Sequence, residues 1–271
     1  MIEITTTEFN RIRDYIKTHY AIALSDEKKT LVSSRLRATL TDLGFANFTD
    51  YFNYLLKEQG DAMVHFIDKI TTNHTFFMRE TDHFDYLRDI TLPFIHQKWG
   101  AQKDLRMWCA ASSSGEESVT LQIIAQEFCK KIGEKWDTQM LASDLCTKVL
   151  DKAVAARYPT EALENLPKQW ITDHFNKVDK DFHQVNDKIR KEILYRKKNL
   201  MDPFNFKKKF QVIFCRNVMI YFDNDTRDDI VRRFYDITEP GGYLFIGHSE
   251  SVSNSRTGFE YIKPAIYQKP M

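Results

Sequence analysis

The stretch CAASSSGEES, residues 109–118, has the small and polar residues of a loop that approaches a ligand closely. It lies between an apolar run and a helical pattern, a junction that commonly binds phosphates at the helix start. Here the helix begins with two acids, Glu116 and Glu117, which would repel phosphates. We therefore expect a positively charged cofactor without phosphates, and S-adenosylmethionine fits, since a glutamate could pair with its ammonium group. The alternative is that these acids only stabilise the first helical turn.

Two further groups of polar residues follow predicted strands. Asp144 ends the strand QMLASD, 29 residues after Gly115, where nucleoside-binding sheets place an acid for the ribose hydroxyls. It could equally cap the next helix. Arg216, Asn217 and Tyr221 follow the strand FQVIFC, where loop hydrogen bonding is the alternative role. Ligands of open α/β sheets lie beyond the carboxyl ends of the strands, so these residues are predicted to share one site.

The periodicity of the chain predicts two parts with different architecture. Residues 1–72 repeat apolar side chains at helical spacing and predict an all-α N-terminal domain. Residues 73–92 predict a connecting segment and a helix that ends near Pro93. Residues 93–271 alternate short strands with amphipathic helices, as in an α/β doubly wound fold that ends in a hairpin. The basic stretch 176–209 interrupts this order and predicts an inserted β-hairpin or edge strand, so we place an inserted β-subdomain around 172–200.

Composition excludes several broad classes of protein. The net charge of +1 gives no general reason to expect nucleic acid as a partner. No apolar run has the length of a membrane span, and the N-terminus lacks the pattern of a secretory signal. The four cysteines never form a Cys-x-x-Cys pair, so we expect buried free thiols, no metal site and a cytoplasmic protein.

Five stretches, in this order, resemble the chemotaxis receptor methyltransferases: TTNHTFFMRE, MWCAASSSGEES, LASDLCTKVLDKA, FCRNVMIYFD and GGYLFIGHSES. They cover essentially the whole chain, and CRNVMIYF followed by GHSE is the most specific part. The resemblance implies a helical domain before a Rossmann-like S-adenosylmethionine-dependent methyltransferase domain with a small inserted β-subdomain. It also implies that the cofactor is contacted by Asn73, Thr75, Arg79, Glu117, Asp144, Asn199, Leu200, Arg216 and Asn217.

The implied reaction is methyl transfer to glutamate side chains of chemoreceptors, giving methyl esters and S-adenosylhomocysteine. Because a glutamate with a pKa of about 4.3 is already an ionised nucleophile, no general base is required. The enzyme must mainly align the reacting atoms, and Arg79 and Tyr221 are the expected catalytic residues.

The expected partner is the cytoplasmic helical domain of a receptor, contacted by a monomeric enzyme. Lys28, Arg35 and Arg37 predict a basic helical face for an acidic receptor helix, although a solvated face is the alternative. Family members that bind a receptor's C-terminal tail peptide are Gly-rich in the β-subdomain loop, whereas residues 160–209 contain no glycine. We therefore expect no dependence on a tail peptide.

Three rival functions remain open at the level of sequence. Ser113, His248 and Asp223 have the chain order of a relaxed hydrolase triad, although Ala111 replaces the first elbow glycine. A nucleic-acid methyltransferase would use the loop Asn217–Ile220 to hold a flipped base, but that loop lacks the usual prolines. A receptor-binding module without turnover is the third possibility, and only an assay distinguishes it from an enzyme.

Overall fold

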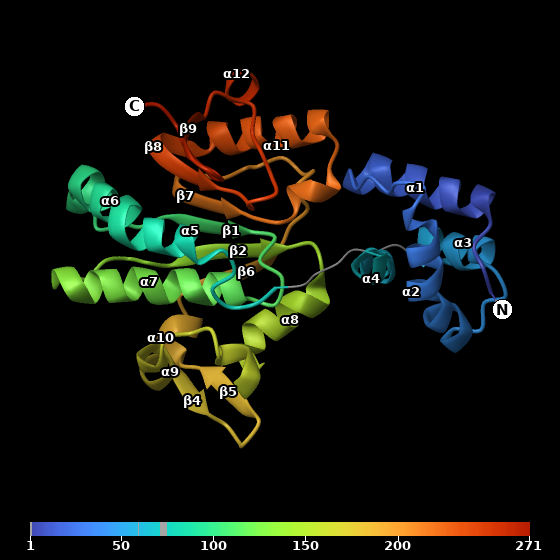
Figure 1. The fold of residues 1–271 in the computed structure, drawn as a ribbon, viewed down its shortest axis with the longest axis horizontal. Coiled ribbons are helices and arrows are strands. Elements are labelled where there is room, and N and C mark those ends of the chain that lie inside the picture. The colour runs from blue at the N-terminus through green and yellow to red at the C-terminus, as the bar shows by residue number, and fades with distance from the viewer. Residues whose placement is uncertain (1, 59, 71–74) are drawn as a thin grey trace.

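The N-terminal part of the chain is a four-helix domain, shown in blue at the right of Figure 1. The structure is a computed structural model that describes residues 2–58, 60–70 and 75–271. A capping box begins the first helix, where the Thr5 hydroxyl accepts from Glu8 N and the Glu8 carboxylate accepts from Thr5 N. Glu8 also accepts from Thr49 N, which fixes the third helix against the first. The helices are α1 (Thr6–Tyr20), α2 (Lys28–Asp42), α3 (Phe48–Glu58) and α4 (Gly60–Ile70).

A seven-stranded sheet forms the centre of the larger part, in the order β6-β2-β1-β7-β8-β10-β9. The first five strands in that order are parallel, and β10 pairs antiparallel with both β8 and β9. The predicted closing hairpin is therefore present. The strands are β1 (Met107–Ala110), β2 (Met140–Asp144), β6 (Ile193–Lys197), β7 (Phe210–Cys215), β8 (Thr238–Phe245), β9 (Glu260–Lys263) and β10 (Ile266–Gln268).

Helices cover both faces of this sheet. Alternate residues of β1 point to opposite faces, so Met107 joins a core cluster with α7 while Trp108 joins another with Phe234 of α11. Figure 1 shows α11 on one side of the sheet and α6 and α7 on the other. The helices of this part are α5 (Thr81–Tyr86), η1 (Leu87–Thr91), α6 (Leu92–Trp99), η2 (Gly100–Gln102), α7 (Glu116–Ile132), α8 (Thr147–Ala155), α10 (Asp187–Arg190), η4 (Met219–Tyr221), α11 (Asn224–Asp236) and α12 (Asn254–Thr257).

A second, three-stranded sheet in the order β3-β5-β4 is inserted between β2 and β6. It spans residues 157–185, whereas the sequence analysis placed the insertion around 172–200. The start was missed because β3 is only three residues long and ends in Pro159. Ile193–Lys197 pairs with β2 and is an edge strand of the main sheet. The remaining elements are β3 (Arg157–Pro159), η3 (Thr160–Leu163), α9 (Lys168–His174), β4 (Phe175–Lys177) and β5 (Phe182–Val185).

The helix expected to end near Pro93 instead continues to Trp99. A π-helical turn over Leu87–Thr91 leads directly into α6, and Pro93 follows this local change in the hydrogen-bond pattern. The rest of the predicted fold class, an all-α domain followed by a Rossmann-like sheet with a small inserted β-subdomain, is confirmed. Among the described residues, no helix has the length and apolar character of a membrane span. All four cysteines are free, and Cys129 is only partly buried.

The helical domain contacts the carboxyl edge of the main sheet. Ala23 N donates to the carbonyl of Tyr221 at 2.7 Å, and Ile22 forms an antiparallel bridge with Phe222. On the opposite side of this contact, Val64 of α4 packs with Cys146 and Val149 at the start of α8. The two parts of the chain therefore enclose the loops that follow β1, β2 and β7.

Candidate cofactor pocket

A pocket lies where the helical domain meets the carboxyl edge of the sheet. Its lining comes from α1, α4 and the residues next to them, from the connecting segment, and from the loops after β1, β2, β6 and β7. Asn73 lies outside the described residues. The other residues predicted for the site all line this one pocket: Thr75, Arg79, Glu117, Asp144, Asn199, Leu200, Arg216, Asn217 and Tyr221.

The loop after β1 lies close against its neighbours and has unusual backbone conformations. Ala111 and Ser113 adopt positive φ angles of 60° and 48°, a conformation that costs energy in residues other than glycine and is common at ligand sites. Gly115 has φ 97°, and a Cβ there would lie 2.9 Å from Ala153, Tyr158 and Tyr195. Only glycine fits this position, so the turn that aims the loop at the pocket depends on Gly115.

Asp144 joins the loops after β1 and β2 at the base of the pocket. One oxygen accepts from Ser113 N at 2.8 Å and the other from Cys146 N at 2.9 Å. Burial raises the pKa of this carboxyl, although the backbone N–H groups act against the rise. Cys146 rather than Asp144 occupies the N-cap of α8, so the capping role considered from the sequence is replaced by a bridge between loops.

The central interaction of the site is a buried arginine held by two carboxylates. The side chain of Arg216 is 1% exposed, and its guanidinium donates to Glu117 at 2.7 Å and to Glu80 at 3.0 Å. It also donates to the backbone carbonyl of Arg79. The sequence predicted Glu117 and Arg216 as separate cofactor contacts, but they form an ion pair across 99 residues of chain. Any cofactor contact with Glu117 must therefore be shared with Arg216.

Two acids that the sequence analysis missed hold the loops after β7 and β8. Glu80 accepts from the Asn217 amide at 3.0 Å and from His248 N at 3.2 Å. Glu250 accepts from the backbone N–H groups of Gly247, Asn217 and Ile220. In the sequence, Glu80 follows Arg79 directly and Glu250 is the acid of GHSE. Neither position indicates a partner that is distant in the chain.

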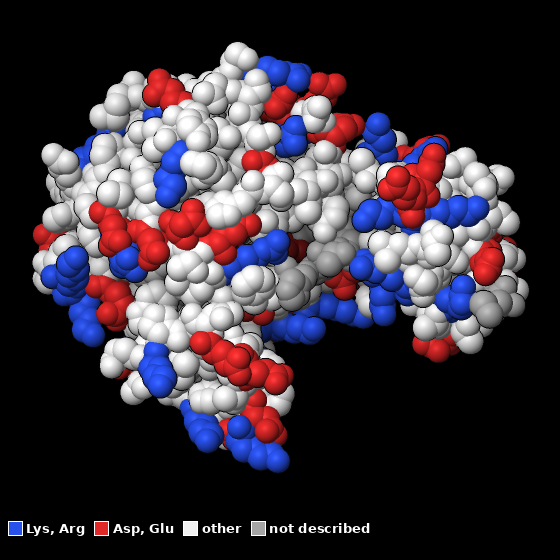
Figure 2. All heavy atoms as spheres, viewed as in Figure 1, with Lys and Arg blue, Asp and Glu red and all other residues white. Residues whose placement is uncertain are grey.

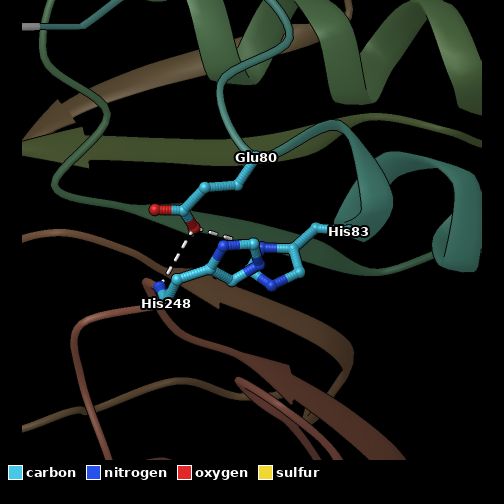
Figure 3. Close-up of side chains that lie close together, drawn as sticks. All are labelled: Glu80, His83 and His248. Carbon is cyan, nitrogen blue, oxygen red and sulfur yellow. Dashed lines mark hydrogen bonds and ion pairs between the residues drawn. The ribbon is translucent and has the colours of Figure 1, made fainter.

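Glu80, His83 and His248 form a compact group behind the pocket (Figure 3). His83 is fully buried, and its Nδ1 lies 3.6 Å from Glu80 Oε2, which is beyond hydrogen-bonding distance. Glu80 Oε2 already accepts from Arg216 and from His248 N, so a metal ion bound at this oxygen would have to displace them. The group belongs to the arginine network and gives no support to a metal centre.

The hydrolase triad is not assembled. His248 pairs with Asp82 at 3.1 Å. Asp223 accepts from Thr226 N as the N-cap of α11 and pairs with Lys17. The Ser113 hydroxyl has no hydrogen-bond partner in the protein. The three residues are therefore engaged in separate interactions.

In the described part of the pocket wall, three buried polar atoms have no partner among the described residues: Ser112 Oγ, Ser113 Oγ and Arg216 Nε. Buried polar groups in folded proteins are nearly always hydrogen-bonded, so atoms of this kind that line a pocket indicate a polar ligand. A donor from Arg216 suits a carboxylate, and the serine hydroxyls can donate or accept. The methionine and ribose groups of S-adenosylmethionine fit these requirements. Of the cations in the described lining, Arg216 is paired with two carboxylates, and Arg79 and Lys198 come from separate segments of the chain.

Comparison with known proteins agrees with this chemistry. The family model "CheR methyltransferase, all-alpha domain" matches residues 7–71, and "CheR methyltransferase, SAM binding domain" matches residues 73–267. The chain belongs to the CheR methyltransferase family. It is therefore an S-adenosylmethionine-dependent methyltransferase of the chemotaxis type, and S-adenosylmethionine is its cofactor.

Curated relatives match over nearly their whole length. A chemotaxis protein methyltransferase of Borreliella burgdorferi is 40% identical, with 99% of this chain and 96% of the relative covered. The chemotaxis protein methyltransferase of Escherichia coli is 34% identical, with 98% and 92% covered. Among solved structures, an S-adenosylmethionine-dependent methyltransferase from Mesorhizobium loti is 15% identical with a TM-score of 0.32, covering 53% of this chain and 46% of that one.

The buried His83 predicts acid sensitivity of the fold. Burial, and next the positive charge of Arg216, lower the pKa of His83 from 6.5 to about 4. The folded protein therefore binds a proton at His83 less tightly than the unfolded chain does. The stability that His83 contributes is present above pH 6.5 and is lost as the pH falls toward 4. We expect His83 to account for about 2 kcal/mol of the stability lost between pH 7 and pH 5.

The measurement is urea unfolding of the wild type and His83→Phe at both pH values. The variant should lose about 2 kcal/mol less than the wild type on acidification. The same substitution at the exposed His19 controls for the change of side chain. An identical pH dependence in wild type and His83→Phe would show that His83 is not the group responsible.

Proposed function

We propose that this methyltransferase transfers the methyl group of S-adenosylmethionine to glutamate side chains of chemoreceptors, forming methyl esters during chemotactic adaptation. The observation that carries the proposal is a pocket whose buried cation is neutralised by two acids, inside a chain of the CheR family. Such a wall favours a cationic, phosphate-free methyl donor. S-adenosylhomocysteine is the product.

The residues around the pocket suit a reaction that needs no general base. No histidine is present among the described lining residues. Glu117 is bound to Arg216, and Asp144 is bound to backbone amides, so neither is poised to remove a proton. A glutamate substrate is already ionised at neutral pH, and the sulfonium activates the methyl group. The remaining task is to align the carboxylate oxygen, the methyl carbon and the sulfur and to exclude water.

Arg79 and Tyr221 are the proposed catalytic residues because both line the pocket and come from different walls of it. The Arg79 guanidinium lies 6.0 Å from the Phe76 ring, and the Arg79 carbonyl is held by Arg216. Tyr221 is fixed by the backbone bond from Ala23. In this proposal the two side chains hold the incoming carboxylate or the methionine end of the cofactor.

The other proposed cofactor contacts follow the order of the loops. Asp144 binds the ribose, and Asn199 and Leu200 border the adenine. The Glu117 carboxylate accepts from the ammonium group while it also accepts from Arg216. Thr75 and Asn217 complete the set among described residues, and Asn73 is proposed from the family resemblance.

The proposed partner is the cytoplasmic helical domain of a receptor, bound by a monomer in the cytoplasm. Figure 2 shows basic side chains on both walls of the hollow between the helical domain and the rest of the molecule, which suits an acidic partner. The basic face expected on α2 is partly engaged within its own domain. Arg35 donates to the Ile70 carbonyl and Arg37 to the Ile2 carbonyl, whereas Lys28 is exposed.

Arg79→Ala should reduce methyl transfer by roughly 100-fold, as expected for loss of a charged contact at the reacting groups. The assay incubates enzyme, labelled cofactor and receptor, and measures base-labile methyl ester on glutamate. Arg88→Ala is a matched control, because Arg88 is an exposed arginine that pairs with Asp85 and Asp89. Near-normal turnover by Arg79→Ala would refute its role, and a wild type that forms no ester would refute the substrate.

Independence from a tail peptide is a separate prediction. Two of the three strands of the small sheet, and the loops that follow β3, lie within residues 160–209, a stretch without glycine, so the backbone lacks the conformational freedom that a Gly-rich peptide-binding loop has. We expect no change in anisotropy when a fluorescent receptor tail peptide is titrated with protein that binds S-adenosylhomocysteine normally. Saturable binding of the peptide would contradict this prediction.

A further inference from the structure

One wall of the cofactor pocket belongs to the helical domain. Val64, Ile67 and Asp68 of α4 line the pocket together with Asp144 and Cys146 from the loop after β2. Val64 also packs directly on Cys146, which fixes α4 against this loop. The ribose end of the pocket is therefore formed at a contact between the two parts of the chain.

Asp68 brings a second acid to this end of the pocket. Its side chain is partly exposed, in contrast to its apolar neighbours Val64 and Ile67. Burial is the main cause that raises the pKa of Asp144 and of the Cys146 thiol, and the charge of Asp68 raises both further. Asp68 and Asp144 therefore present two carboxylates to the same pocket, from two different parts of the chain.

Adenosine offers donors that match such a pair of acceptors. It carries two ribose hydroxyls and a 6-amino group, and it has no negative charge. The buried Ser112 hydroxyl, 2% exposed for the whole residue, also lines this pocket without a protein partner, which independently indicates a polar ligand. A ligand with several donors matches the acceptor oxygens of both acids.

We propose that Asp68 is a second acceptor for the adenosine part of the cofactor, so that cofactor binding joins the helical domain to the methyltransferase domain. The proposal rests on S-adenosylmethionine binding and is independent of which side chain is methylated. It assigns to α4 a direct role in ligand binding rather than only a structural one.

The first test is calorimetric titration with S-adenosylhomocysteine, without any receptor. Asp68→Ala should weaken binding roughly 10- to 100-fold, the range for loss of a hydrogen bond to a charged group. Asp68→Asn, which keeps one acceptor oxygen, should lose less. Asp61→Ala is the matched control, because Asp61 lies on the same helix and pairs with Lys197 without lining the pocket. Its affinity should stay within about twofold of the wild type.

A second measurement separates direct contact from mere support of the domain contact. Three analogues of S-adenosylhomocysteine lack, in turn, the 2′-hydroxyl, the 3′-hydroxyl and the 6-amino group. In the wild type, removing the group that Asp68 binds should weaken binding. If Asp68 binds adenosine, this loss should be at least 10-fold smaller in Asp68→Ala, or in Asp68→Asn, for one of the three analogues. Unchanged binding of S-adenosylhomocysteine by Asp68→Ala, or equal losses for all three analogues in variant and wild type, would overturn the proposal.

Discussion

The structure depends on the ion pairs of one buried arginine. Arg216 follows a fully buried strand and is almost completely enclosed, so its charge must be matched. Glu117 from the start of α7 and Glu80 from the connecting segment match it, and both come from distant parts of the chain. Removing one partner of such a buried network typically costs about 3–5 kcal/mol, so the three segments are fixed in a common place. The same contacts hold the backbone of Arg79 at the pocket.

This network also sets the chemistry of the pocket. Two carboxylates and one guanidinium carry a net negative charge, which disfavours phosphates and favours the ammonium and sulfonium of S-adenosylmethionine. Arg216 keeps one buried donor, Nε, without a protein partner. At the other end, Asp144 is held by two backbone N–H groups and lines the pocket together with Asp68. Both ends of the pocket therefore present acids, in agreement with a ligand whose donors and positive charges are spread along its length.

The sequence predicted the fold class and placed most site residues in one pocket because local patterns carry that information. The strand–loop–helix pattern around Gly115 and the apolar run before Arg216 are of this kind. Glu80 and Glu250 were missed because a single acid in a loop has no pattern, and its partners lie up to 168 residues away. The pairing of Glu117 with Arg216 was missed for the same reason. The inserted sheet was misplaced because the three-residue β3 ends in a proline and shows no alternation.

The most direct measurement is the affinity of S-adenosylhomocysteine for Arg216→Leu, compared with the wild type by calorimetry. Leucine fills part of the buried volume but leaves Glu80 and Glu117 without their shared cation, so the connecting segment should no longer be held at the pocket. If the network organises the cofactor site, the variant should bind at least about 100-fold more weakly, even under conditions where circular dichroism shows that it is folded. Wild-type affinity in the folded variant would contradict the central place given to Arg216.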